Sequence, residues 1–519
     1  MTPRDIFPWH REPLFWLWLA ALALGFWFNL WAVPLFDVDE GAFAEASREM
    51  LERGDFVTTY LNGELRFDKP ILVYWLQAAA ITLLGPTELA VRLPSALAAS
   101  AWSALVVWFL ARYRDRRTGL AAGTILATCL SLTVIGRAAT ADALLNLWLW
   151  AALAAIFAYW KEGRRGFLLA AHGAIGLGLL TKGPVAVLVP LAASGLFYGS
   201  LGQWRDWLRA VFDPRGLALL LAIAAPWYVA EYLAQGQAFI DGFFLKHNVG
   251  RFSGPMEGHA GSLFYYVPVV LVGVLPFTAA LLALLPRWRE LWADPLQRYL
   301  LLLFGFVLVF FSLSGTKLPH YVNYGLTGVV ALMAIHLPRL RSGFWALLPA
   351  ALWLGALLAV PWILDGIEVA EPFYRAALAG HEAYFGPRYL IACLLALAIV
   401  GVLMALRRWP ADLRLLLAGP AGVLVLAGFF IPALGGMIQG PVKEAALLAR
   451  AQGYPSVVQY RVHLPSFSFY RRAVTPRRDP RPGEVALTDV GHADDWPRAQ
   501  VLYQRGGVVL LRRPPAPPP

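Results

Sequence analysis

Long apolar runs alternate with short polar stretches from residue 14 to residue 432 of this chain. A helix of roughly 20 apolar residues crosses the hydrocarbon core of a bilayer, so the pattern predicts about thirteen membrane-spanning helices. We place them at 14–35, 72–84 extended by 88–110, 119–135, 142–160, 167–181, 184–200, 216–234, 263–285, 299–313, 321–337, 343–363, 387–406 and 413–432. The first run has no small-residue cleavage site, so we interpret it as a retained helix and not as a signal peptide.

Charges in the connecting loops predict the orientation of these helices. Short cytoplasmic loops collect Lys and Arg, and basic clusters occur at 112–117, 161–165, 205–215, 287–298, 339–341 and 407–414. With alternating spans, all six clusters fall on one side, which we assign to the cytoplasm. The acidic first loop and the stretch 365–382 fall on the other side. An odd number of spans then places the C-terminus outside, opposite the N-terminus.

Composition supports the prediction of a polytopic α-helical membrane protein. Hydrophobic residues make up 59% of the 519 residues and charged residues only 15%, whereas soluble chains carry about a quarter charged residues. The net charge of +11 could indicate a nucleic-acid partner, but the bases lie in short clusters between apolar runs. They are therefore better explained as determinants of topology. Cys129 and Cys393 both fall in apolar runs, so no disulfide framework is expected.

The last part of the chain has a different pattern. We divide the chain into a transmembrane domain at 1–435, a small extracytoplasmic α/β domain at 436–513 and a disordered Pro-rich tail at 514–519. In the second domain, the pattern predicts one amphipathic helix at 442–452 and strands at 456–462, 485–489, 501–503 and 508–511. No internal repeat is visible, and transporters are often built from repeated halves, so this counts against transport.

The first outer loop, 36–70, carries an unusual density of charge. From Asp37 to Asp68 it holds nine acids, and with Lys69 it holds four bases. Ionisable groups at a membrane surface between apolar spans are usually functional. Because the loop is acidic and precedes a long series of spans, it is the first place to search for an active site.

The motifs of this loop are similar to those of a known family. The run Asp39-Glu40-x-x-Phe43-Ala44-Glu45, with Arg48-Glu49-Met50, Asn62-Gly63 and Phe67-Asp68-Lys69-Pro70, resembles the first periplasmic loop of bacterial GT-C glycosyltransferases. These are relatives of protein O-mannosyltransferases and of the lipid A aminoarabinose transferase. Further matches follow in order along nearly the whole chain: Arg92-Leu93-Pro94-Ser95, Asp142, Thr181-Lys182-Gly183-Pro184, 247–252, His259, 265–268, 314–321 and 465–470. Two departures are Asp68, where Glu is more usual, and Ile71, where a second Pro is common.

The resemblance implies an integral membrane glycosyltransferase with its active site at the outer face of the bacterial inner membrane. It would take a sugar from a polyprenyl-phosphate carrier and pass it, with inversion, to a lipid such as lipid A or to another envelope acceptor. The alternative is a transporter or flippase of lipid-linked saccharides. A transport cycle would place its ionisable groups on broken helices near the midplane of the bilayer, and a non-catalytic scaffold would leave the outer charges unexplained. No nucleic-acid partner is expected.

Three carboxylates are candidates for catalysis. Transfer from a sugar phospholipid needs a base for the acceptor and cations for the phosphate leaving group. Asp39 and Glu40 are adjacent and cannot both face one point, and the family pattern favours Asp39. Asp142 begins a span on the same predicted side, so Asp39 and Asp142 could form paired carboxylates. The alternative for all three is capping of a helix N-terminus.

Five cations lie on the predicted outer face, against the charge bias that sets orientation. They are Lys69, Arg251, Lys182, Lys317 and Arg137. A carrier phosphate would supply their counter-charge, with Arg binding in a bidentate manner and Lys as a point charge. The alternative is snorkelling to phosphates of bilayer lipids, which fits Arg137 best.

A divalent metal ion is the one cofactor that the sequence suggests. Asp68 together with His259 or His247 could share a zinc- or manganese-type ion, because these metals accept carboxylate and imidazole ligands. The resemblance implies that a loop acid and a loop His bind metal in relatives. Two ligands far apart in sequence are a weak signal alone, so the metal is an expectation and not a requirement.

Overall fold

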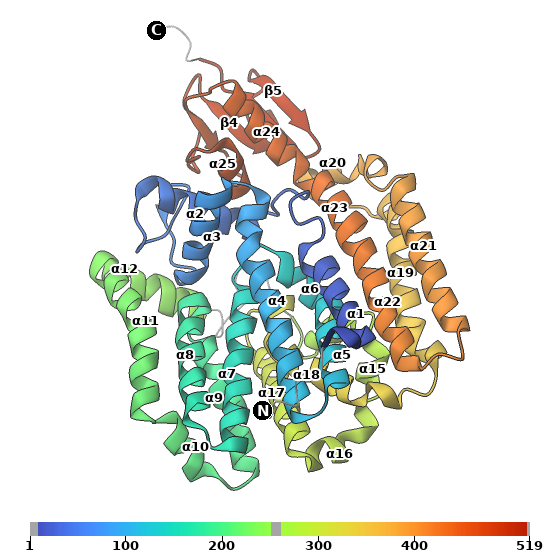
Figure 1. The fold of residues 1–519 in the computed structure, drawn as a ribbon. Helices are drawn as coiled ribbons and strands as arrows, with labels where there is room; N and C mark the ends of the chain where they lie inside the picture. Colours follow the sequence, from blue (N-terminus) through green and yellow to red (C-terminus); the bar gives the residue numbers. More distant parts are fainter. Residues whose placement is uncertain (1–8, 251–260, 516–519) are drawn as a thin grey trace.

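Long helices lie side by side in the computed structural model, and a small α/β unit lies at one end of them (Figure 1). The structure describes residues 9–250 and 261–515. The longer helices of the bundle are α4 (Glu88–Tyr113), α7 (Asp142–Glu162), α8 (Arg165–Lys182), α9 (Val185–Ser200), α11 (Pro214–Gln235), α17 (Pro295–Leu313), α18 (Asn323–His336), α19 (Gly343–Gly366), α21 (Pro387–Ala405) and α22 (Ala411–Val425).

Shorter elements join and flank these helices. They are η2 (Trp9–Arg11), α1 (Pro13–Leu22), η3 (Ala23–Trp27), α2 (Asp39–Arg53), β1 (Tyr60–Leu61), β2 (Glu64–Leu65), α3 (Leu72–Leu84), α5 (Arg116–Thr128), α6 (Leu130–Arg137), α10 (Trp204–Val211), α12 (Gln237–Phe239), η4 (Ile240–Gly250), α14 (Tyr266–Gly273), α15 (Thr278–Leu282), η5 (Leu285–Arg287), α16 (Trp288–Ala293), η6 (Pro319–Val322), η7 (Leu337–Arg339), α20 (Pro372–Leu378), η8 (His381–Ala383), η9 (Leu426–Phe430) and α23 (Ile431–Ile438). The two short strands β1 and β2 form an antiparallel pair inside the first loop.

The helices identify a multi-pass membrane protein. Within the described residues, eight helices are long and apolar enough to cross a membrane, or nine if the bent pair α5 and α6 counts as one span. Three shorter apolar helices, at Pro13–Trp27, Leu72–Leu84 and Val185–Ser200, fall below that length. The sequence predicts about thirteen spans, whereas eight or nine within the described residues are long and apolar enough to cross a membrane.

Breaks in the predicted spans account for part of the difference. The run at 263–285 forms two short helices, α14 and α15, instead of one. The run at 119–135 bends by 69° between α5 and α6. The run at 14–35 is helical only as far as Trp27, and the segment beyond it leads to the acidic loop. The joined span at 72–84 and 88–110 is two helices, because Gly85 separates them with a φ of 74°.

Burial separates central helices from peripheral ones. The segment Pro319–Arg339 is 89% buried within the protein, whereas α11 is only 17% buried although its hydropathy is higher. Such an apolar, poorly buried helix suits a lipid environment, in which exposed apolar side chains carry no penalty. Small residues bring central helices close together: a Cβ at Gly119 of α5 would lie 2.6 Å from the Val107 oxygen of α4.

The C-terminal part folds as an α/β unit of helix α24 (Gly440–Ala451), strand β3 (Val457–Gln459), helix α25 (Pro465–Arg471), strands β4 (Val485–Asp489), β5 (Gln500–Arg505) and β6 (Val508–Arg512), and η10 (Ala493–Asp495). The sheet has the order β3-β4-β6-β5. β3 is parallel to β4, and the other neighbours are antiparallel. The four strands and α24 lie where the sequence predicts them, whereas α25 is an additional helix.

Helix α25 attaches this unit to the first loop. The backbone nitrogen and hydroxyl of Ser466 donate to the two oxygens of Asp37, at 2.9 and 2.5 Å. The Tyr470 hydroxyl donates to Glu88 of α4 at 3.0 Å, and Lys443 of α24 pairs with the same carboxylate. The α/β unit therefore covers the end of the bundle at which α2 lies (Figure 1).

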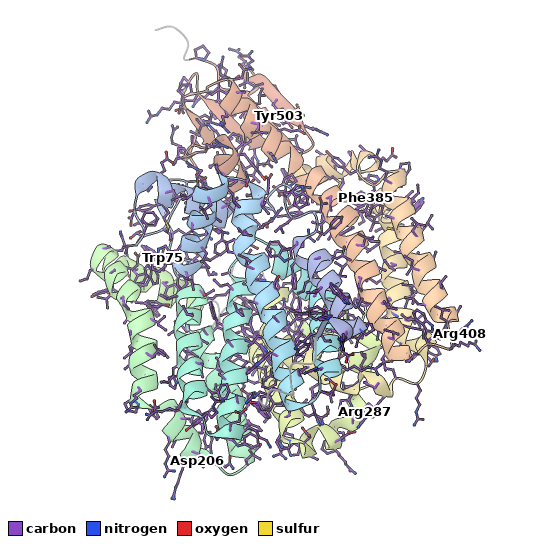
Figure 2. All side chains as sticks on the ribbon, viewed as in Figure 1. Trp75, Asp206, Arg287, Phe385, Arg408 and Tyr503 are labelled. Carbon is purple, nitrogen blue, oxygen red and sulfur yellow. The ribbon has the colours of Figure 1, made fainter. Side chains whose placement is uncertain are left out.

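The two ends of the bundle differ in charge. Figure 2 shows Asp206, Arg287 and Arg408 at the end away from the α/β unit, and Tyr503 on that unit. These three residues belong to three of the basic loops, at 205–215, 287–298 and 407–414. Their common placement agrees with the alternation predicted from loop charge.

Candidate active site

Glu40 fixes the start of helix α2. Its carboxylate accepts two bonds from the Arg92 guanidinium, at 2.6 and 2.8 Å, and further bonds from the backbone nitrogens of Phe36 and Ala139. Burial alone would raise the pKa of Glu40, but the Arg92 charge more than offsets burial and the pKa is lowered. A fully bonded carboxylate of this kind favours a positioning role for Glu40 over a catalytic one.

Asp39, the preceding residue, has a contrasting environment. It begins α2, its side chain is exposed, and it lines a large cavity. The N-cap position belongs to Val38, so Asp39 does not cap the helix. Within residues 9–250 and 261–515, the Asp39 carboxylate makes no hydrogen bond or ion pair, although it interacts electrostatically with Arg66 and His320. The Asp39 carboxylate is therefore available to a ligand.

The cavity has a volume of about 1670 Å³ and connects the first loop with the bundle. Its charged and imidazole-bearing lining residues are Asp39, Glu40, Glu64, Arg66, Asp68, Lys69, Arg92, Arg137, Asp142, Lys182, Lys246, His247, His320, His463 and Arg477. One wall is apolar and includes Val134, Val272, Leu426, Phe430 and Leu434. A cavity with a charged centre and an apolar wall suits an amphiphile with an ionic head group.

Asp142 forms a second charged centre of the cavity. The Lys182 ammonium donates to its Oδ1 at 2.6 Å, and the Tyr324 hydroxyl donates to the same oxygen at 3.2 Å. His320 Nε2 is 4.0 Å from this oxygen. Asp142 is the first residue of α7, and Ala141 at the N-cap makes no side-chain bond. Asp142 is therefore bonded in an ion pair with Lys182 and does not cap α7.

Lys182 reaches Asp142 because α8 ends directly after it. Gly183 follows with a φ of 78°, a conformation that favours glycine. A Cβ at this position would also lie 2.6 Å from the ring of Phe243, so the turn has no room for a side chain. The ammonium thus lies at the C-terminus of a helix, where the helix dipole favours a cation.

Lys69 and Asp68 lie at the end of the first loop. Lys69 Nζ donates to the Asp68 carbonyl at 3.0 Å, and Lys69 interacts electrostatically with Asp142. Asp68 pairs with His247 Nε2 at 2.7 Å and with Arg66 at 3.1 Å. Burial would raise the pKa of Asp68, but the hydrogen bond from His247 and the charge of Arg66 outweigh burial and hold it well below its usual range.

The predicted metal pair Asp68 and His247 is thus in direct contact. Over the described ranges, no three His, Cys, Asp or Glu side chains are grouped so as to hold a metal ion. The Asp68 carboxylate is already bonded to His247 and Arg66. His259, the other predicted ligand, lies outside the described residues, as does Arg251. The metal ion stays a prediction.

Two predicted cations have other surroundings. Lys317 is buried, and its ammonium donates to the carbonyls of Ser312 and Ser314 at 2.9 and 2.7 Å. It is not among the residues that line the cavity, and phosphate binding by Lys317 stays a prediction. Arg137 does line the cavity, and its Nη2 donates to the Phe28 carbonyl at 2.8 Å.

Several lining residues were not among the sequence candidates. Arg66, Lys246, His463 and Arg477 line the cavity from four separate segments, and Tyr324, which donates to Asp142, was also missed. Burial, with the nearby charges of Arg477 and Arg66, lowers the pKa of His463 to about 4, so its imidazole is neutral at pH 7. His320 lies within the motif at 314–321, and this was the one signal in the sequence that could have identified it.

Comparison with known proteins shows the family to which the chain belongs. Residues 68–229 match the family model described as dolichyl-phosphate-mannose-protein mannosyltransferase. A protein of Erwinia tasmaniensis, undecaprenyl phosphate-alpha-4-amino-4-deoxy-L-arabinose arabinosyl transferase, is 32% identical over 432 residues, which cover 77% of this chain and 73% of the relative. The chain belongs to the family of this arabinosyl transferase. Within the family, the protein of that name from Aeromonas hydrophila is 31% identical over 67% of this chain, and the match spans 63% of the relative, a little under two thirds of its length.

Solved structures support the fold assignment. The crystal structure of ArnT from Cupriavidus metallidurans bound to undecaprenyl phosphate superimposes with a TM-score of 0.81 at 22% identity, covering 96% of this chain and 98% of that one. The oligosaccharyltransferase of Archaeoglobus fulgidus gives a TM-score of 0.52 at 13% identity, over 95% of this chain and 71% of that one. The fold is therefore that of the family and of GT-C membrane glycosyltransferases.

Proposed function

We propose that this protein transfers a sugar from a polyprenyl-phosphate carrier to a lipid acceptor such as lipid A. Undecaprenyl phosphate is the carrier to test first, with 4-amino-4-deoxy-arabinose as the sugar, because both occur in the names of the relatives. The observation that carries the proposal is the Asp39 carboxylate, which faces the cavity without a partner among the described side chains while Lys69 and Lys182 line the same cavity. A base and phosphate-binding cations are the groups that this reaction needs.

The reaction is a single displacement with inversion. An acceptor oxygen attacks the anomeric carbon, and its proton moves to Asp39. The bond between the anomeric carbon and the carrier oxygen breaks, and its electron pair leaves with the carrier as polyprenyl phosphate. Lys69, with Arg251 as the sequence suggests, offsets the charge that develops on this phosphate. Lys182 pairs with Asp142 in the same cavity, and Glu40 and Arg92 orient α2.

The proposed site faces the outer side of the bacterial inner membrane. In this topology the chain crosses the membrane thirteen times, with short or broken helices supplying the crossings beyond those that pass the length test. The α/β unit and the cavity then share the outer face. The support is the clustering of basic loops at the end away from that unit (Figure 2).

The decisive experiment replaces Asp39 with Asn, which keeps the size of the side chain and removes its charge. A positioned base contributes about 10²–10⁴-fold to rate, so D39N should lose turnover by that factor. Turnover is measured in detergent as the release of free polyprenyl phosphate from a sugar-loaded carrier. Binding of the sugar-free carrier should be unchanged, because Asp39 makes no contact that holds the fold.

The control is D206N, since Asp206 is exposed at the opposite end of the bundle. It should behave as the wild type. Near-normal turnover of D39N would exclude Asp39 as the base. Absence of product from the wild type, together with movement of intact carrier across liposome membranes, would instead identify a flippase.

A further inference from the structure

Arg137 carries a buried charge, and one nitrogen of its guanidinium has no hydrogen-bond partner among the described residues. Its side chain is at the C-terminal end of α6 and the residue is 6% exposed. Nη2 donates to the Phe28 carbonyl, but Nη1 is buried and has no hydrogen-bond partner among the residues that the structure describes. The nearby carboxylate of Glu40 is already bonded to Arg92 and to two backbone nitrogens.

This arrangement is costly without a ligand. A buried ion that lacks a counter-charge loses its hydration and gains no Coulombic energy in return. Arg137 also lines the cavity, so an anion entering the cavity could bond to Nη1 and supply the missing charge. A planar guanidinium is suited to a phosphate or a carboxylate.

The cavity that Arg137 lines also has apolar lining residues. Val134 precedes it on α6, and Val272, Leu426, Phe430 and Leu434 line the same cavity. Phe28, whose carbonyl binds Arg137, packs on η9: a Cβ at Gly428 would lie 3.0 Å from the Phe28 ring. The η9 wall and the guanidinium are therefore neighbours. An anion that binds here would carry hydrocarbon, as an acidic lipid does.

Arg137 has charged neighbours that differ from those of the cations in the proposed carrier site. Lys182 and Lys69 both act on Asp142, whereas Arg137 interacts with Arg92 and Glu40. The segment 138–141 lies between the two groups and is held by Glu40 at the Ala139 nitrogen and by Ser95 at the Thr140 carbonyl. One cavity thus holds two cationic centres, and a transferase with two lipid substrates needs two head-group sites.

We infer that Arg137 binds the anionic group of the acceptor lipid, whose chains lie against the η9 and α23 wall. The inference rests on the proposed function and deepens it, since it assigns a residue to the head group of the acceptor lipid. It also separates Arg137 from the carrier-binding cations with which the sequence groups it.

Steady-state kinetics with each substrate varied in turn test the inference. R137Q keeps a donor for the Phe28 carbonyl but loses the charge, so KM for lipid A should rise about 10–100-fold, the worth of a charge-assisted bond. KM for the carrier-linked sugar should not change. R137K should recover part of the loss. For lipid A freed of its phosphates, R137Q and the wild type should have the same KM.

The matched control is R414Q. Arg414 is equally buried, at 5%, and donates to the carbonyls of Leu403 and Met404, away from the cavity. R414Q should keep the wild-type KM for lipid A. If R137Q had a higher KM for the carrier-linked sugar than the wild type, Arg137 would belong to the carrier site. If R137Q and the wild type had equal KM values for both substrates, Arg137 would have only a structural role. Either result overturns the inference.

A binding measurement separates this inference from the proposed function. The thermal shift of the wild-type protein in detergent should be larger with lipid A than with dephosphorylated lipid A, and R137Q should lose that difference. No transfer is needed for this readout. Selective binding of lipid A without turnover would refute the proposed transferase function and support the lipid site at Arg137. Turnover without selectivity for the lipid A phosphates would support the transferase and refute the lipid site.

Discussion

Adjacent carboxylates at the start of α2 have opposite environments. Glu40 is bonded on both oxygens, and Asp39 projects into the cavity. Breaking a buried ion pair by removing one partner typically costs about 3–5 kcal/mol, so Glu40 matters chiefly to the fold. The same ion pair anchors the first turn of α2, in which Asp39 lies. In this way one residue positions its neighbour for chemistry.

Asp37 makes the docking of α25 sensitive to pH. Burial raises its pKa to about 7, and the bonds from Ser466 only partly oppose burial. In the unfolded chain the group titrates near 3.8. Between these values the folded state holds a proton that the unfolded state has lost, so stability falls as pH rises through this window and is flat above about pH 7. The full loss is at most about 4 kcal/mol, at 1.36 kcal/mol for each pKa unit.

The test is the melting temperature of D37N between pH 5 and pH 8. Asn cannot ionise, so the variant should show a weaker fall with pH than the wild type, and at pH 8 it should be at least as stable. Activity with carrier need not be measured. An identical pH profile for both proteins would show that Asp37 is ionised throughout this range.

Motifs in the sequence identified Asp39, Lys69, Asp142 and Lys182, and the structure brings all four to one cavity. They could be found because each lies in a short, distinctive run. His463 and Arg477 were missed because they reach the cavity only through the docking of the α/β unit, which no local pattern encodes. Arg66 was missed although its partners, Tyr74 and Asp68, lie close to it in the chain. Lys317 shows the converse: its motif is present, but its ammonium donates to the carbonyls of Ser312 and Ser314, at the end of α17.

At the scale of elements, two broken helices meet beside the site. The Leu130 nitrogen, at the bend between α5 and α6, donates to the carbonyl of Leu275, at the break between α14 and α15, at 2.9 Å. Backbone groups freed by a break inside a bilayer must find partners in the protein. The sequence shows two continuous apolar runs here, since hydrophobicity does not report such breaks. The bend directs α6, and hence Arg137, toward the cavity.

Helix α2 contacts α25 through Gly41. A Cβ there would lie 2.0 Å from the Asp37 carboxylate and 2.6 Å from the Ser466 nitrogen. G41A should therefore separate the two helices at a cost of about 1–3 kcal/mol, as overpacking does. Protease cleavage between α24 and α25 should become faster, and the melting temperature should fall.

The control for this substitution is G305A in α17, where a Cβ would meet no atom within 4 Å. Alanine favours a helix over glycine by about 0.5–1 kcal/mol, so this variant should be unchanged or slightly more stable. Equal stability of G41A and the wild type would show that α25 is not held closely against α2.

The whole molecule combines a bundle and an α/β unit around one cavity. His463 and Arg477 reach the cavity from the unit, while the bundle supplies Asp142 and Lys182. Apolar runs predicted the bundle because length and hydropathy are properties of each helix alone. The cavity was not predictable from them, since its volume arises where the first loop, the broken helices and the unit meet.

Topology is the property of the whole molecule that is most directly testable. Thirteen crossings from a cytoplasmic N-terminus place the C-terminus outside, whereas eight crossings would return it to the cytoplasm. A reporter that is active only in the cytoplasm, fused after Pro514, should be silent. The same reporter inserted at Arg408, in a basic loop at the opposite end of the bundle, should be active. Activity after Pro514 together with silence at Arg408 would place the cavity, with Asp39 and Arg137, on the cytoplasmic side. Both substrates would then have to be presented from within the cell.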